Sequence, residues 1–84
     1  MNNDNKHFTS SSFYLAVLLL SNGFELRDVI RDGANKCLFV FDSSPDIQNL
    51  ADIYRYGDGS EPELRVPITV VEQNIKKLKK IIYG

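Results

Sequence analysis

The chain has 84 residues, of which 43% are hydrophobic, and a formal net charge of −1. A chain of this length forms one domain, whose core just suffices for stability without a metal ion or disulfide bonds. The sole cysteine, Cys37, excludes an intramolecular disulfide, and its apolar surroundings indicate a small buried hydrophobe in a reducing compartment. We expect a flexible polar N-terminus over residues 1–7 and a single domain over residues 8–84.

Charge is distributed unevenly along the chain. Residues 1–64 carry five Lys and Arg against ten Asp and Glu, net −5, whereas residues 65–84 carry five against one, net +4. An acidic body with a basic C-terminal segment can attract a second copy of itself, an acidic partner or a phosphate backbone. Charge alone therefore leaves the partner open.

The first predicted element is a helix over about residues 10–22. With Thr9 as the N-cap, Phe8 and Phe13 have the spacing of a hydrophobic staple, and Gly23 falls at the position that commonly ends a helix. Apolar residues cover nearly the whole circumference of this helix. We therefore expect it to be the most buried element.

The next segment is predicted to be a β-hairpin. Alternating apolar residues from Phe24 to Ile30 indicate one strand, and CLFVF at residues 37–41 indicates the other. The turn residues DGAN at positions 32–35 separate them. Because the second strand is apolar at every position, we expect it to be central in its sheet or covered on both faces.

A second helix is predicted to begin at Pro45, with Ser44 as its N-cap, and to end near Tyr56, before Gly57. Its apolar residues recur at helical spacing and form one stripe, which faces the core. The stripe consists of Ile47, Leu50, Ala51 and Tyr54.

The C-terminal segment contains a possible strand and a helix. Alternation over residues 64–68 favours a short third strand, which Pro67 would confine to a sheet edge. A capping box from Thr69 to Glu72 predicts a helix over residues 70–83. The predicted class is α+β, a single small domain in the order α-β-β-α-(β)-α, with an antiparallel hairpin packed against helices. Its buried residues should include Leu18, Phe39 and Leu50.

Four lysines of the last helix are the candidate binding residues. Apolar residues at a helical spacing form a seam on this helix, and the lysines lie mostly on the opposite side. The seam is Val71, Ile75, Leu78 and Ile82, and the lysines are Lys76, Lys77, Lys79 and Lys80. One interpretation is a solvated face that offsets the helix dipole. The other is a surface for nucleic acid or an acidic partner.

The sequence carries no catalytic or metal-binding signature. One histidine and one cysteine are too few for a zinc site, and GDG at residues 57–59 lacks the Lys and Ser or Thr of a phosphate-binding loop. Tyr56 and Tyr83, at predicted helix ends, are either half-exposed structural residues or stacking platforms for single-stranded nucleic acid. We therefore expect no enzyme activity, no cofactor, no small-molecule substrate and no membrane association.

Three runs of the sequence carry a family resemblance: HFTSSSFYLAVLLLSNGFEL, KCLFVFDSSPDIQNLADIY and the final IKKLKKIIYG. With them the chain resembles a family of small domains of unknown function found in phages and integrated mobile elements. The resemblance extends from about Phe8 to Tyr83. It implies the cytosol of a bacterial, archaeal or phage-infected host cell, and it implies no activity and no site residues.

These observations favour a small, non-enzymatic accessory protein in the cytoplasm. We expect it to act through a protein partner or through self-association. Weak nucleic-acid binding through the basic C-terminal helix is the alternative.

Overall fold

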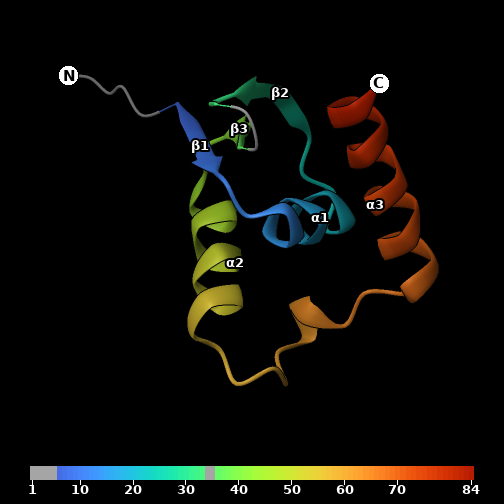
Figure 1. Cartoon of the computed structure of the whole chain (residues 1–84). Helices are drawn as coiled ribbons and strands as arrows, with labels where there is room; N and C mark the ends of the chain where they lie inside the picture. The colour runs from blue at the N-terminus through green and yellow to red at the C-terminus, as the bar shows by residue number, and fades with distance from the viewer. Residues whose placement is uncertain (1–5, 34–35) are drawn as a thin grey trace.

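The structure, a computed structural model that describes residues 6–33 and 36–84, places helices on one face of an antiparallel sheet (Figure 1). Its elements in chain order are β1 (His7–Ser10), α1 (Phe13–Ser21), β2 (Leu26–Arg31), β3 (Cys37–Asp42), α2 (Pro45–Tyr56), the 3-10 helix η1 (Pro62–Leu64) and α3 (Ile68–Tyr83). Helix α1 lies between α2 and α3 (Figure 1). The predicted α+β class is confirmed.

The strand order of the sheet is β1-β3-β2, with both neighbours antiparallel to β3. Of the two alternatives predicted for residues 37–41, a central strand or a strand covered on both faces, the structure has the central strand. A third strand is present, but it is β1 rather than residues 64–68. Those residues instead include the end of η1, an irregular segment and the start of α3, because Pro62 opens a 3-10 turn and Pro67 lacks the N–H that a ladder needs.

Some predicted features fall on residues that the structure does not describe. The polar N-terminus lies outside the described part of the chain except for Lys6 and His7, and His7 already pairs with Asp42 in the sheet. Two of the four predicted hairpin-turn residues, 34 and 35, also lie outside it.

Helix α1 begins three residues later than predicted and ends where Gly23 indicated. Thr9 belongs to β1, so the N-cap is Ser12, whose hydroxyl accepts a hydrogen bond of 3.2 Å from the Leu15 N–H. At the other end the Gly23 and Phe24 N–H groups donate to the Leu20 and Leu19 carbonyls, both at 3.1 Å. This pair of bonds is a Schellman motif, and the φ of 92° at Gly23 suits a residue without a Cβ.

The starts of the other two helices differ in their capping. The Ser44 hydroxyl accepts a hydrogen bond of 3.2 Å from the Ile47 N–H, which confirms the predicted N-cap of α2. Helix α3 begins at Ile68, two residues earlier than predicted, and Pro67 at its N-cap makes no side-chain capping bond. The predicted capping box at Thr69 is therefore wrong.

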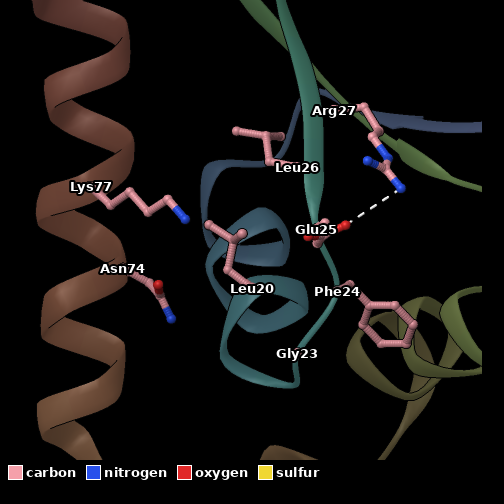
Figure 2. A pocket seen from close by; sticks show the side chains of 8 residues that line it. All are labelled: Leu20, Gly23, Phe24, Glu25, Leu26, Arg27, Asn74 and Lys77. Carbon is pink, nitrogen blue, oxygen red and sulfur yellow. Dashed lines mark ion pairs between the residues drawn. The ribbon is translucent and has the colours of Figure 1, made fainter.

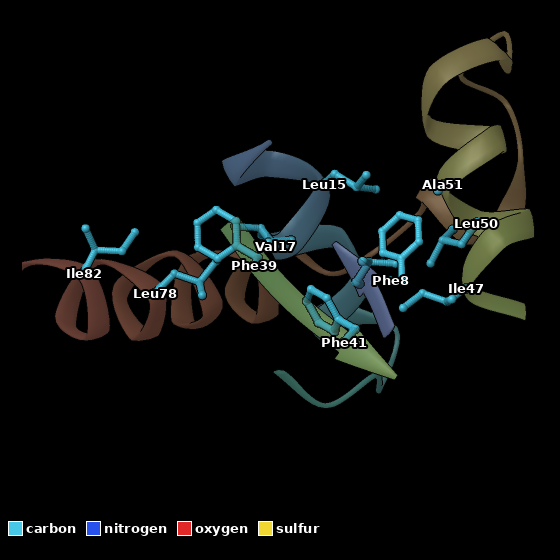
Figure 3. Close-up of a cluster of buried hydrophobic side chains, with 12 residues drawn as sticks. Phe8, Leu15, Val17, Phe39, Phe41, Ile47, Leu50, Ala51, Leu78 and Ile82 are labelled. Carbon is cyan, nitrogen blue, oxygen red and sulfur yellow. The ribbon is translucent and has the colours of Figure 1, made fainter. Parts of the chain in front are cut away.

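The hydrophobic core lies between the sheet and the helices (Figure 3). Phe39 and Leu50 are buried as predicted, with 2% and 4% of their surface exposed. Leu18 was predicted to be buried but is only half-buried, and Tyr54 was predicted to belong to the core stripe but is 41% exposed. Both residues line the same surface depression at the edge of the core.

Two side-chain hydrogen bonds attach α3 to the rest of the domain. The Asn74 amide donates to the Ser21 hydroxyl at the end of α1. The Arg31 guanidinium, from β2, donates to the Ile82 carbonyl in the last turn of α3. Helix α3 is thus held near its middle and at its C-terminal end.

Candidate binding surfaces

The four candidate lysines all lie exposed on α3, opposite its apolar seam. Leu78 and Ile82 are buried, and Val71 and Ile75 pack against the core, which confirms the predicted seam. Among the described residues, the salt bridges are those of Arg27 with Glu25 and Asp42. None of the four lysines therefore takes part in an intramolecular ion pair of the described chain.

Lys77 differs from the other three lysines in its surroundings. It extends from α3 toward α1 and the start of β2 and borders a depression of about 260 Å³ (Figure 2). Glu25 and Arg27, which line the same depression, form an ion pair at 3.4 Å. This depression is therefore lined by both acidic and basic side chains. It does not offer the uniformly positive surface that would favour binding of a nucleic-acid backbone.

The remaining three lysines share one face of α3 with an aromatic residue. Lys76, Lys79 and Lys80 are close together by helical spacing, and Tyr83 follows Lys79 and Lys80 by one turn. Tyr83 is 80% exposed. We call these four residues the basic face. The structure thus places three of the four predicted lysines on one face of α3. Tyr83, which the sequence analysis considered separately as a residue at a helix end, lies on the same face.

An apolar depression of about 190 Å³ lies on another part of the surface. It is formed by α1, the end of α2, the segment from the last residue of η1 into the following connector, and the start of α3, and we call it the apolar groove. Its lining residues are Tyr14, Val17, Leu18, Tyr54, Leu64, Val66 and Val71. Small-molecule pockets typically measure about 300–1,000 Å³, so the groove suits one or two side chains of a protein better than a metabolite.

The apolar groove could not be predicted from the sequence because its residues come from four separate segments. Two signals nevertheless pointed toward it. Helix α1 is apolar around nearly its whole circumference, and three of its residues, Tyr14, Val17 and Leu18, line the groove. The alternation of Leu64, Val66 and Ile68 favours a strand, but in the structure Leu64 and Val66 line the groove and Ile68 is 78% exposed.

The charged residues between the start of α2 and the middle of α3 are mostly acidic. Helix α1 carries no charged residue, whereas residues 45–75 carry six acidic and two basic residues, net −4. The acidic residues are Asp46, Asp52, Asp58, Glu61, Glu63 and Glu72, and the basic ones are Arg55 and Arg65. Asp46 and Glu63 line a different depression, together with Asn22 and Phe24, so these charges are spread over more than one part of the surface.

The connector between α2 and η1 is ordered by its own hydrogen bonds. The Glu61 carboxylate accepts from the N–H groups of Asp58 and Gly59, at 3.2 and 3.1 Å. The Ser60 hydroxyl donates to the Asp58 carboxylate at 2.6 Å, and the Ser60 N–H donates to the same oxygen at 2.9 Å. Both bonds lower the pKa of the Asp58 carboxyl, and the bond from the Ser60 hydroxyl has the larger effect.

The single histidine of the chain, His7, and the nearby Ser10 both belong to β1. His7 is exposed and Ser10 is buried, so they lie on opposite faces of β1. The Ser10 and Ser12 hydroxyls accept backbone hydrogen bonds at the start of α1. Within residues 6–33 and 36–84, no three His, Cys, Asp or Glu side chains gather in a way that could hold a metal ion.

Two further findings concern single residues and the membrane. Cys37, predicted to be buried, is half-buried in a depression of about 160 Å³ that Ile82 and Tyr83 also line. Tyr56, 82% exposed, lies free of the core at the end of α2.

In the described part of the chain, every helix is too short or too polar to cross a bilayer.

A model of a known protein family matches nearly the whole chain. The family model of a domain of unknown function, DUF5659, matches residues 5–84. No curated protein and no solved structure matches the chain. The predicted membership of a family of domains of unknown function is thus confirmed over residues 5–84.

Proposed function

From the premise that the chain belongs to the DUF5659 family of domains of unknown function, we propose that it acts by binding another protein, and not by catalysis. The apolar groove carries this proposal. Tyr14 and Tyr54 line it and are 63% and 41% exposed, an arrangement typical of surfaces that bind proteins. Tyrosine is among the residues that contribute most to binding energy at interfaces.

The proposed role is that of a small accessory protein of the kind that phages and mobile elements carry, in the cytoplasm of the cell that harbours the gene. Such a protein needs no chemistry of its own when it acts by occupying a surface of its partner. The modest size of the groove supports recognition of a few side chains of a protein rather than of a small molecule.

Site-specific photo-crosslinking tests this proposal. Tyr54 is replaced by the photoreactive amino acid p-benzoylphenylalanine in the organism that naturally carries the gene, and the cells are irradiated. Tyr56 provides a matched control, because it lies on the same helix, is more exposed and does not line the groove. We expect protein adducts from position 54 and none from position 56. Equal yields from the two positions, or no adduct from position 54, would contradict the proposal.

Nucleic-acid binding is a second candidate function, favoured by the exposure of the four lysines and by Tyr83 beside three of them. If all four lysines contact duplex phosphates, log–log plots of affinity against salt should have a slope of about −3 to −4. Fluorescence anisotropy with labelled single- and double-stranded oligonucleotides measures this slope. Absence of binding at low salt would exclude the candidate.

A further inference from the structure

The distal half of α3 presents a cluster of cations on the side away from the core. Lys76, Lys79 and Lys80 are all exposed and lie within about one helical turn of one another. The sole acidic residue of the helix, Glu72, lies one turn before Lys76, so the charged residues of this face are all cations from Lys76 onward. A surface of this kind attracts a polyanion.

Tyr83 lies within this cluster of cations. It follows Lys79 by four residues and Lys80 by three, the spacings at which side chains on a helix are neighbours. It is 80% exposed, so most of its surface is open to a ligand. Aromatic side chains beside basic ones suit a single-stranded nucleic acid, because its bases stack on the rings while the cations contact its phosphates.

The last turn of α3, which carries Tyr83, is fixed to the sheet. The Arg31 guanidinium, from β2, donates a hydrogen bond to the Ile82 carbonyl, and the Ile82 side chain is buried in the core. A side chain carried on an ordered turn loses little backbone entropy on binding, and tyrosine has few rotatable bonds to restrict. The fold therefore presents the Tyr83 ring to a ligand from an ordered backbone.

Tyr83 favours a single strand over a duplex as the ligand. In a duplex the flat surfaces of the bases are covered by their neighbours, so the Tyr83 ring would have nothing to stack on, whereas the bases of a single strand are free to stack on aromatic side chains. The basic face extends from Lys76 to Tyr83, about 10 Å along the helix axis, which is the length of a few nucleotides.

Lys77 lies outside this arrangement. It borders the depression that Glu25 and Arg27 also line, on the side of α3 that faces α1 (Figure 2). The Glu25 carboxylate in that depression disfavours a phosphate there. Lys77 is therefore a matched control for the lysines of the basic face, because it is the same type of residue on the same helix.

We propose that the basic face binds single-stranded nucleic acid, with a base stacked on Tyr83 and the neighbouring phosphates held by the three lysines. This inference rests on the second candidate function, nucleic-acid binding, and names the class of nucleic acid. The basic face shares no residue with the lining of the apolar groove. Because stacking and phosphate contacts do not read the bases, binding is weak and tolerant of sequence.

Fluorescence anisotropy of the full chain tests the proposed contact. The probe is a labelled oligodeoxythymidine of about 15 nucleotides, which forms no duplex with itself. We expect binding at about 50 mM salt that weakens toward about 200 mM with a log–log slope of about −2, the single-strand value for three phosphate contacts. A duplex of the same length should bind more weakly, because Tyr83 cannot stack in it.

Two pairs of variants separate the stacking contact from the phosphate contacts. Tyr83→Leu should weaken single-strand binding at least about fivefold and leave duplex binding unchanged. Tyr56→Leu, at an equally exposed tyrosine on α2, should bind like the wild type. Lys80→Gln should reduce the steepness of the slope by about 0.7, whereas Lys77→Gln should leave it unchanged. Tyr83→Phe, which keeps the ring, should bind like the wild type. Circular dichroism establishes that each variant retains the fold.

Several results would overturn this inference. A duplex bound as tightly as the single strand, or equal affinities of Tyr83→Leu and Tyr56→Leu, would remove the stacking contact and leave nucleic-acid binding as a candidate function. Displacement of the probe by polyglutamate as readily as by unlabelled oligodeoxythymidine of equal charge would identify an acidic protein as the ligand. Absence of binding at low salt would remove both the inference and the candidate function. The protein binding proposed for the apolar groove is tested separately, by the crosslinks from position 54.

Discussion

The side-chain amide of Asn74 donates a hydrogen bond of 3.0 Å to the Ser21 hydroxyl, and this bond joins the middle of α3 to the last residue of α1. Asn74→Ala removes the donor from a partly buried site. We expect a loss of about 0.5–1.5 kcal/mol in the free energy of unfolding, measured by urea denaturation. Gln73→Ala, at the exposed neighbouring position, should change stability by less than about 0.5 kcal/mol. Equal losses in the two variants would show that the bond contributes nothing.

Adjacent leucines of α1 should differ in their contribution to stability. Leu19 has no exposed surface, whereas Leu18 is half-buried at the apolar groove. Leu19→Ala should cost about 2–5 kcal/mol because it leaves a cavity, and Leu18→Ala should cost clearly less because solvent already reaches the site. Thermal and urea unfolding measure both. A cost for Leu18→Ala as large as that for Leu19→Ala would mean that the groove is closed in solution.

Gly57 should tolerate a side chain poorly for a steric reason. A Cβ at this position would lie 2.5 Å from the Ile53 carbonyl oxygen, a backbone atom that cannot rotate away. We expect Gly57→Ala to destabilise the domain by about 1–3 kcal/mol, as overpacking does. Differential scanning calorimetry provides the measurement.

Gly59 provides the contrast with Gly57. It has open space around it but a φ of 93°, so its constraint is conformational. Asn adopts positive φ more readily than Ala. Gly59→Asn should therefore be milder than Gly59→Ala, whereas Gly57→Asn should be no milder than Gly57→Ala. The opposite order at Gly57 would contradict a steric origin.

The Asp58 carboxyl should titrate at higher pH when its hydroxyl donor is removed. Its pKa in the folded chain is lowered, chiefly by the Ser60 hydroxyl, so its contribution to stability is present above the unfolded pKa and is lost as the pH falls through the folded pKa. Ser60→Ala should raise this pKa toward the ordinary value of an aspartate. Carboxyl-carbon NMR titration measures the shift, and an unchanged pKa would contradict the role of the hydroxyl.

The parts of the fold that the sequence predicts well depend on neighbouring residues. The end of α1 at Gly23 and the start of α2 at Ser44 and Pro45 are examples, since a glycine at positive φ and a serine cap act within one helical turn. The central position of β3 was also predictable, because a strand that is apolar on both faces has to be covered or flanked.

Strand β1 illustrates what local patterns miss. Phe8 pairs with Phe41, far along the chain, and the same Phe8 and Thr9 also fit a helix start. Ser12 competes with Thr9 as a cap, and only the pairing with β3 decides between them. Likewise, the exposure of the lysines was predictable from helical periodicity, whereas the apolar groove requires the positions of four segments in space.

The pairing of β1 across the chain also bears on the order in which the domain folds. The β2–β3 hairpin and the helices form from contacts between near neighbours, whereas β1 docks only after a long loop has closed, which is slow for entropic reasons. We therefore expect β1 to join late and to detach first in partial unfolding. Its departure uncovers one edge of β3, the most apolar strand of the sheet. A strand edge that is transiently unpaired can pair with the same strand of another chain. By covering this edge of β3, strand β1 therefore protects the domain against aggregation.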